Sequence, residues 1–182
     1  GGTDLLVSKP ADTKILVDIS RLPLSYIEEG DFLRIGATTN FNAIQTSEHL
    51  RKNPLNIISE ASGEIGHYNL RHLATIGGNL CNAVPSADAA IPLITLDAEA
   101  VIAGVDGDRI VKFEDFFTFV QETVLDGREI LKEIRIPQQP PGTGASFKRI
   151  GRTNVDIALV NAAVRLTLDG DGVCADSRIV LG

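Results

Sequence analysis

The stretch Thr75-Ile76-Gly77-Gly78-Asn79 lies deep inside the chain and has a counterpart at its start, Gly1-Gly2-Thr3-Asp4-Leu5. In each stretch a pair of glycines stands beside a hydroxyl side chain and among apolar residues. Adjacent glycines weaken regular structure, and they are tolerated where the backbone turns sharply or where another group approaches it closely. A diphosphate requires both properties, because it binds backbone N–H groups that no Cβ holds away. The two stretches therefore predict two loops that converge on a dinucleotide, although a Gly-Gly pair alone is ordinary turn chemistry.

Composition excludes several classes of protein. The net charge of −7 and the lack of a Lys/Arg stripe argue against a nucleic-acid partner. No apolar run approaches bilayer length and no signal-peptide pattern is present, so we expect no membrane span. The 2 cysteines are too few for an iron–sulfur cluster or a cysteine-based zinc site, and the 3 histidines lack metal-ligand spacing. We therefore predict no metal site in this chain and a reducing, cytoplasmic location.

Apolar patterning predicts a mixture of strands and helices without strict alternation. Strands are expected over residues 14–19, 32–37, 99–104, 109–112, 129–136, 145–150, 158–168 and 178–181. Helices are expected over residues 41–50, 54–64 and 86–96, with Ser86 capping the last and one of Thr38, Thr39 and Asn40 capping the first. Residues 113–119 form an aromatic turn or short helix, whose phenylalanines we interpret as core. This mixture indicates an α+β fold, and the absence of G-x-G-x-x-G and Walker A motifs excludes Rossmann and P-loop folds.

The order of motifs along nearly the whole chain resembles the FAD-binding medium subunit of molybdenum hydroxylases. That family includes xanthine dehydrogenase, aerobic carbon monoxide dehydrogenase and aldehyde oxidoreductases. Its central motif is matched by residues 74–83 (ATIGGNLCNA), followed by Pro85-Ser86-Ala87-Asp88. Further matches occur in the family's order, at residues 1–6, 17–20, 33–37, 116–117, 123–125, 129–131, 134–137, 146–149 and 156–158.

The resemblance implies a specific domain organisation. A two-subdomain FAD-binding domain of the PCMH/vanillyl-alcohol-oxidase type would occupy residues 1–137, with a break between subdomains near 22–30. A linker over residues 138–144 would precede the start of an antiparallel-sheet C-terminal domain over 145–182. Compared with the family, the first strand and helix and the rest of the C-terminal domain are missing, so both ends look cut.

The resemblance also implies the residues that contact FAD. They are Gly1, Gly2, Thr3, Asp4, Leu5, Ile65, Thr75, Ile76, Gly77, Gly78, Asn79, Asp88, Leu131 and Lys148. The two glycine stretches would bind the diphosphate, and we expect Asp4 to point at backbone N–H groups because like charges repel. Asp88 would accept a hydroxyl of the sugar or ribityl chain; the alternative is simple capping at a helix start.

Three of these positions act differently. Lys148 would stand near the pyrimidine edge of the flavin and raise its potential, or would be an exposed lysine on a strand edge. Ile65 and Leu131 would touch the cofactor through backbone or apolar surface; from the sequence they are indistinguishable from core.

The function implied is electron transfer through FAD, with no catalytic residue in this chain. An iron–sulfur small subunit and a molybdopterin large subunit would be the partners, in a dimer of heterotrimers. They alone would carry the molybdopterin and the [2Fe–2S] clusters, and NAD or another acceptor would receive the electrons.

Two other functions remain open from the sequence. A stand-alone flavin oxidase or reductase of the same superfamily would need an acid, base or substrate-binding residue, and Arg71, His67 and Tyr68 are the candidates. Turnover of a small substrate without partners would favour it. A non-catalytic nucleotide-binding module would instead remain colourless after addition of FAD.

Overall fold

A five-stranded sheet forms the base of the structure. The computed structural model describes residues 1–8, 13–153 and 155–182. The sheet has the order β1-β2-β7-β3-β4, and all of its neighbouring strands are antiparallel. Its strands are β1 (Ile27–Glu28), β2 (Phe32–Gly36), β7 (Ile130–Pro137), β3 (Glu99–Gly104) and β4 (Gly107–Lys112). The strands expected over 99–104 and 109–112 form the hairpin of β3 and β4, which turns through Val105 and Asp106.

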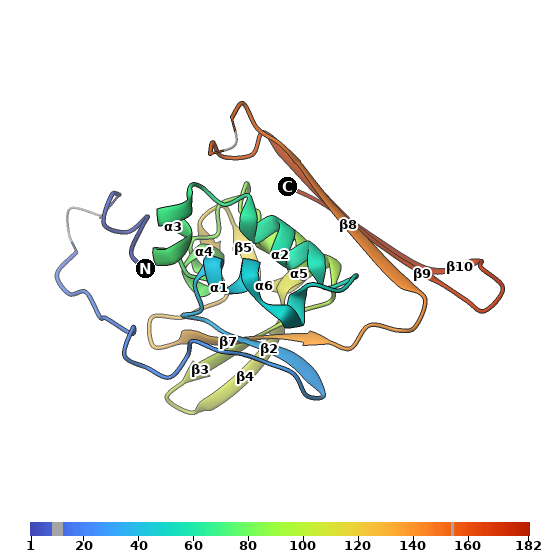
Figure 1. Cartoon of the computed structure of the whole chain (residues 1–182). Helices are drawn as coiled ribbons and strands as arrows, with labels where there is room; N and C mark the ends of the chain where they lie inside the picture. Colours follow the sequence, from blue (N-terminus) through green and yellow to red (C-terminus); the bar gives the residue numbers. More distant parts are fainter. Residues whose placement is uncertain (9–12, 154) are drawn as a thin grey trace.

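Short helices pack on this sheet and lie between it and a second sheet (Figure 1). They are α1 (Phe41–Thr46), the 3-10 helix η1 (Glu48–Leu50), α2 (Asn56–Gly63), α3 (Tyr68–Leu73), α4 (Ile76–Asn82), α5 (Ala90–Thr95) and α6 (Phe113–Phe116). A small hairpin of β5 (Phe117–Phe119) and β6 (Glu122–Thr123) follows α6. Fully buried side chains such as Ile35, Phe41 and Leu93 form the core where helices meet the sheet.

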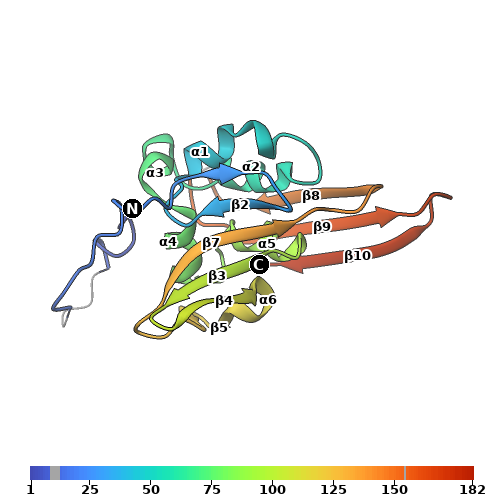
Figure 2. The same ribbon diagram turned by 90° about the horizontal axis from the view of Figure 1, so that it is seen from below.

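The second sheet has three antiparallel strands in the order β10-β9-β8. They are β8 (Thr143–Ile150), β9 (Val160–Leu168) and β10 (Cys174–Leu181). In Figure 2 these strands lie side by side and extend past the helices. In β9 several polar side chains are buried and several apolar ones are exposed, the reverse of the usual pattern. The buried ones include Asn161, Arg165 and Thr167, whereas Val164 and Leu166 are 38% and 40% exposed. The face toward the helices is therefore partly polar, and the opposite face is apolar.

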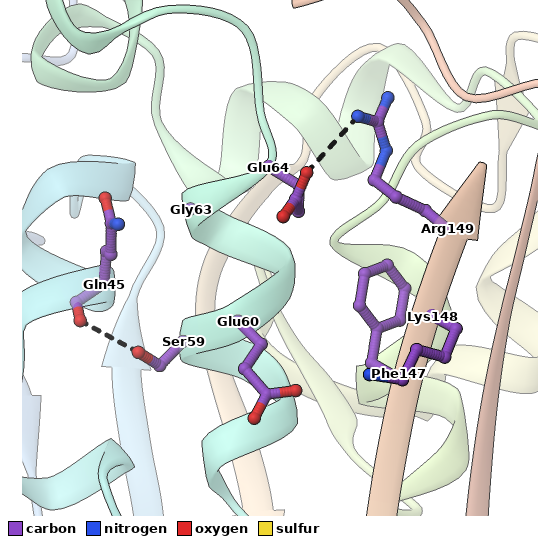
Figure 3. A pocket seen from close by; sticks show the side chains of 8 residues that line it. All are labelled: Gln45, Ser59, Glu60, Gly63, Glu64, Phe147, Lys148 and Arg149. Carbon is purple, nitrogen blue, oxygen red and sulfur yellow. Dashed lines mark hydrogen bonds and ion pairs between the residues drawn. The ribbon is translucent and has the colours of Figure 1, made fainter. Parts of the chain in front are cut away.

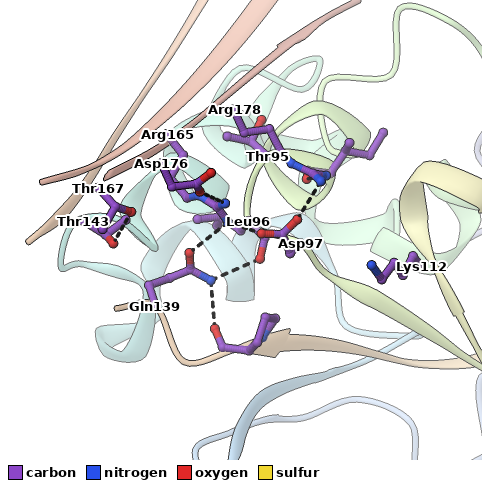
Figure 4. A network of polar contacts seen from close by, with 12 residues as sticks. Thr95, Leu96, Asp97, Lys112, Gln139, Thr143, Arg165, Thr167, Asp176 and Arg178 are labelled. Carbon is purple, nitrogen blue, oxygen red and sulfur yellow. Dashed lines mark hydrogen bonds and ion pairs between the residues drawn. The ribbon is translucent and has the colours of Figure 1, made fainter. Parts of the chain in front are cut away.

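Ion pairs join the partly polar face to the turn that follows α5 (Figure 4). Asp97 in that turn pairs with Arg165 of β9 and, at 3.0 Å, with Arg178 of β10. Arg165 also contacts Asp176 at 2.6 Å, and Arg178 contacts Glu114 at 3.1 Å. Charged side chains therefore connect the second sheet to the helical layer.

Several expected elements are confirmed. Asn40 caps α1, since its side chain accepts the N–H of Ala43 at 2.8 Å. The helix expected over residues 54–64 corresponds to α2, and the strand expected over 129–136 corresponds to β7. β8 begins at Thr143, so the last two residues of the predicted linker belong to a strand.

Other expectations are wrong. Residues 14–19 form no strand, and Ile15 and Val17 are 79% and 80% exposed. A β-branched run becomes a strand only when a neighbour pairs its backbone, and no described residue does so here. The helix expected to begin at Ser86 begins at Ala90 instead. Its N-cap residue is Ala89, and no side chain caps it. Of the predicted core phenylalanines, Phe119 is 72% exposed.

No helix within residues 1–8, 13–153 and 155–182 is both long and apolar enough to cross a bilayer.

Candidate functional site

The second glycine stretch begins a helix, which corrects the expected loop. Gly77 and Gly78 lie in the first turn of α4, and Thr75 is its N-cap. The Thr75 hydroxyl accepts the N–H of Gly78 at 3.2 Å. This cap starts the helix despite two residues of poor helix propensity. The N–H of Ile76 is also paired, with the carbonyl of Thr39 at 3.0 Å.

Gly77 is explained by packing within the chain. Its N–H donates to the carbonyl oxygen of Ala37 at 2.9 Å. A Cβ built at Gly77 would stand 2.6 Å from that oxygen and 2.7 Å from the Cβ of Ala37. Helix α4 can approach the end of β2 this closely only because residue 77 has no side chain. The Gly77 N–H, which was expected to face a ligand, is paired inside the fold.

Gly78 has a different environment. It is exposed, and a Cβ built there would meet only the Oγ1 of Thr75, at 3.0 Å. The neighbouring Asn79 has a buried side-chain oxygen, Oδ1, with no hydrogen-bond partner in the described part of the chain. Packing within the protein therefore leaves Gly78 open to close approach by another molecule, beside a polar atom that lacks a partner.

The first glycine stretch lies against this helix start, near the chain terminus marked N in Figure 1. A Cβ built at Gly1 would stand 2.8 Å from the carbonyl oxygen of Leu73 and 3.5 Å from the nitrogen of Thr75. Gly2 has a φ of 74°, in the left-handed region that favours glycine, and its carbonyl accepts the N–H of Leu6 at 2.9 Å. The two stretches, distant in sequence, therefore converge.

The rest of the first stretch forms a turn beside α4. Asp4 accepts a hydrogen bond from the Asn82 side-chain amide, Nδ2 to Oδ2 at 3.0 Å. The expectation that Asp4 would accept backbone N–H groups is therefore wrong, because a side-chain amide satisfies it. Thr3 is half-buried, and Leu5 is 47% exposed.

Two further candidate residues belong to the packed interior or its margin. Leu131 of β7 is 3% exposed, and Ile65 is partly buried against the core. The carbonyl of Ile65 accepts a hydrogen bond from Arg71 Nη1 at 3.2 Å, and the carbonyl of Gly66 accepts another at 3.1 Å. His67 caps α3 by accepting the N–H of Leu70. Arg71 and His67, the candidates for acid–base chemistry, therefore make structural hydrogen bonds.

A cleft of about 580 Å³ lies between α1, α2 and β8 (Figure 3). It is lined by Gln45, Ser59, Glu60, Gly63, Glu64, Phe147, Lys148 and Arg149. Successive side chains of a strand point to opposite faces, and the Phe147 side chain is buried toward the helices. Arg149 shares that face and its side chain is 6% exposed, whereas Lys148 is exposed. Lys148 was expected at the FAD site and Arg149 was not, although the alternation around the buried Phe147 could have indicated that Arg149 faces the helices.

Asp88 is buried beneath the second sheet, with 7% exposure. Asn161 Nδ2 donates to its Oδ1 at 2.6 Å, and Arg149 Nε lies 3.3 Å from its Oδ2. Burial raises the pKa of this carboxyl, while the hydrogen bond from Asn161 and the charge of Arg149 act in the opposite direction. Ala89 is the N-cap of α5 and no side chain caps that helix, so the capping alternative for Asp88 is wrong.

Groups of three or more His, Cys, Asp or Glu side chains arranged to hold a metal ion are absent from the described residues.

A family model described as the FAD binding domain in molybdopterin dehydrogenase matches residues 1–139. This chain belongs to that family. The match confirms the family assigned from the motif order, and the mixed helices and antiparallel sheets confirm the α+β class.

Curated relatives match over most of this chain. Subunit alpha of the 6-hydroxypseudooxynicotine dehydrogenase complex of Paenarthrobacter nicotinovorans is 37% identical, over 97% of this chain and 59% of the relative. The xanthine dehydrogenase FAD-binding subunit of Escherichia coli O157:H7 is 31% identical, over 100% of this chain and 64% of the relative. This chain therefore spans about three fifths of the length of these relatives.

Solved structures show the same fold. A chain of carbon monoxide dehydrogenase from Hydrogenophaga pseudoflava superimposes with a TM-score of 0.81 and 31% identity, covering 87% of this chain and 55% of that one. A chain of quinoline 2-oxidoreductase from Pseudomonas putida 86 gives a TM-score of 0.78 at 31% identity, with the same coverage.

Proposed function

We propose that this chain is the FAD-binding, electron-transferring part of a molybdenum-containing hydroxylase or dehydrogenase. The observation that carries the proposal is the convergence of Gly1 and Gly2 on the start of α4, where Gly78 is open to a ligand. The two stretches are separated by more than seventy residues in sequence, and a hydrogen bond from the Asn82 side chain to Asp4 joins the first stretch to α4. Family membership identifies the ligand that such a site would take as FAD.

The residues present fit the diphosphate and sugar parts of FAD. Gly78 would admit phosphate oxygens close to the backbone, and the Thr75 hydroxyl beside it would donate a hydrogen bond. The Asn79 side chain, whose Oδ1 lacks a partner within the described residues, would pair with a sugar hydroxyl or orient its amide to a phosphate. Asp88 retains acceptor sites for a hydroxyl. When bound, FAD supplies the redox chemistry, and the protein binds, orients and shields it.

The names of the relatives support a proposal for the partners. Two relatives of this chain are named as a subunit of a dehydrogenase complex and as an FAD-binding subunit of xanthine dehydrogenase. We therefore infer an iron–sulfur subunit as electron donor and a molybdopterin subunit as the site of substrate oxidation. NAD or another electron acceptor is the proposed acceptor, the cytoplasm the proposed location, and a dimer of heterotrimers the proposed assembly.

The domain boundaries given above and the contacts of Ile65, Leu131 and Lys148 with FAD form part of the same proposal. A stand-alone flavoenzyme is less well supported, because Arg71 and His67 are engaged in hydrogen bonds that hold α3 and the turn before it.

The test is bound flavin in a matched pair of glycine variants. The protein that carries this chain is purified with its accompanying subunits, and FAD is measured by absorbance and after release by acid. Gly78→Val fills the open space beside the backbone and should lose most of the flavin. Gly127→Val is the control, because a Cβ at Gly127 meets nothing within 4 Å. Wild-type protein without flavin, or Gly78→Val with a full complement of FAD, would overturn the proposal.

A further inference from the structure

Asp88 joins the helical layer to two strands of the second sheet. It lies in the turn between α4 and α5, outside that sheet, and yet both of its oxygens contact sheet residues. Asn161 of β9 donates to one oxygen at 2.6 Å, and Arg149 of β8 lies 3.3 Å from the other. Asn161 is 1% and Asp88 7% exposed, so this hydrogen bond lies in the interior of the protein. One buried carboxylate thus connects the segment after α4 to β8 and β9, which lie more than fifty residues later in the chain.

The charge on Asp88 depends on Arg149. Burial raises the pKa of the carboxyl, and the other charged side chain that acts on it, Glu64 at the end of α2, raises it further. The hydrogen bond from Asn161 and the positive charge of Arg149 oppose both effects. A buried carboxylate is costly without a cation, and losing one partner of a buried ion pair leaves the other uncompensated. Removal of Arg149 would therefore leave Asp88 with the hydrogen bond from Asn161 but with no positive charge to oppose Glu64.

Arg149 has two other contacts that fix its position. Nη1 lies 3.5 Å from Glu64 Oε2, an ion pair marked by a dashed line in Figure 3, and Nη2 donates to the carbonyl of Asp156 at 2.5 Å. The guanidinium therefore meets three segments: the end of α2, the turn before α5 and the β8–β9 connection. A planar group with several donors in fixed directions can serve three such acceptors, which an ammonium group does less well.

We propose that Arg149 is a positioning residue of the FAD site, which acts by holding Asp88 in place to accept a hydroxyl of the cofactor. The inference rests on the proposed function. An ionised carboxylate has about four acceptor positions, so the contacts with Asn161 and Arg149 leave capacity for a ligand. Retention of FAD thereby depends on the second sheet, even though the glycines proposed to bind its phosphates lie in α4 and at the chain start, outside that sheet.

The first test compares FAD binding by substitutions at one buried and one exposed arginine in the intact protein with its accompanying subunits. Arg149→Gln should raise the FAD dissociation constant by about tenfold or more, as expected for a lost interaction of about 1.4 kcal/mol. Arg149→Lys keeps the positive charge but lacks the planar set of N–H donors of the guanidinium. It should therefore recover part of the lost FAD affinity. Arg51→Gln is the matched control, because the Arg51 side chain is 61% exposed and its ion pair with Glu48 lies at the surface, and it should change the constant by less than about twofold.

The second test uses pH to separate this role from a general loss of packing. In FAD-free Arg149→Gln, the pKa of Asp88 in the folded protein rises further above its unfolded value. The stability deficit relative to wild type is then largest at neutral and alkaline pH. It shrinks as the pH falls through the raised pKa, because Asp88 then takes up a proton. The double variant Asp88→Asn/Arg149→Gln should lack this dependence.

The outcomes distinguish the two proposals. Wild-type protein that carries no FAD would overturn the proposed function itself. Wild-type protein that carries FAD, together with an Arg149→Gln variant that binds it equally well, would overturn the role of Arg149 alone. A stability deficit of Arg149→Gln that is constant with pH would also overturn it.

Discussion

The carbonyl oxygen of Ala37 accepts the amide hydrogen of Gly77 at 2.9 Å, and a Cβ at Gly77 would stand 2.6 Å from the same oxygen. At Gly78, a Cβ would have the Thr75 hydroxyl oxygen as its single neighbour within 4 Å. The absence of a side chain therefore has a different physical consequence at each of these two adjacent glycines. The first lets α4 pack on the end of β2, and the second leaves the backbone open at the position where we propose that FAD binds.

Alanine should distinguish these two glycines in the absence of FAD. Gly77→Ala should lower the free energy of unfolding by about 1–3 kcal/mol, because backbone must move to admit the methyl group. Gly78→Ala should raise it by up to about 1 kcal/mol, because alanine is the better helix former. Urea denaturation measures both values. An equal loss at the two positions would contradict the separate roles.

Loss of the Asp97 carboxylate should weaken attachment of the second sheet. Asp97→Asn leaves Arg165 and Arg178 with one acceptor fewer. Because Asp97 is one third exposed, we expect a loss of about 1–3 kcal/mol in unfolding free energy, less than for a fully buried pair. Hydrogen exchange of β9 amides should increase. Arg128→Gln is the control, since its ion pair with Asp126 is exposed and spans 3.9 Å. Unchanged exchange in Asp97→Asn would contradict this prediction.

Glu129 should make folding sensitive to acid. Arg109 donates to both of its oxygens, from Nε at 2.7 Å and Nη2 at 2.8 Å, and these bonds with the N–H of Asp126 hold the pKa of Glu129 at about 2. Because this pKa is depressed, the stabilisation is complete above the ordinary pKa of about 4.3 and is lost as the pH falls toward the folded value.

Glu129→Gln should therefore flatten the dependence of stability on pH between roughly pH 5 and pH 2. The curve is measured by denaturation at a series of pH values. Glu122→Gln, at an exposed position on β6, is the control and should leave the curve unchanged. A Glu129→Gln curve as steep as that of wild type would refute the prediction.

The two cysteines should react at very different rates. Burial raises the pKa of the Cys81 thiol to about 11, whereas Cys174 is exposed on β10. Since the thiolate is the reactive form, iodoacetamide at neutral pH should modify Cys174 first and Cys81 only after unfolding. Mass spectrometry of the peptides measures this order. Rapid modification of Cys81 in the folded protein would show that α4 opens readily.

Local signals predicted much of the fold. The Asn40 cap, the strands around Asp106 and the pattern of β7 each depend on a few adjacent residues, and each was found close to where it was expected. Residues 14–19 failed because a strand requires a partner that local composition cannot supply. Ser86 failed because hydroxyl residues favour turns as well as caps, and residues 85–86 form a turn.

The candidate site was predicted less completely than the fold. Motif order identified the two glycine stretches, and the structure brings them together. It could not separate Gly77 from Gly78, because that difference lies in the distance to Ala37, a residue forty positions earlier. Nor could it distinguish Arg149 from Lys148 until the neighbouring Phe147 fixed which face of β8 is buried. In both cases the environment of the residue depends on contacts with distant segments, which the adjacent sequence does not reveal.

The apolar outer face of the second sheet has a practical consequence. Val164, Leu166 and Ile179 expose hydrocarbon on paired strands, and β10 forms an edge of the sheet. Wherever this face meets water it should bind the fluorescent dye ANS, and solutions should turn cloudy as the pH approaches the isoelectric point near 4.9. Val164→Lys at its centre should reduce both effects, so charge placed there would make the protein easier to handle at high concentration.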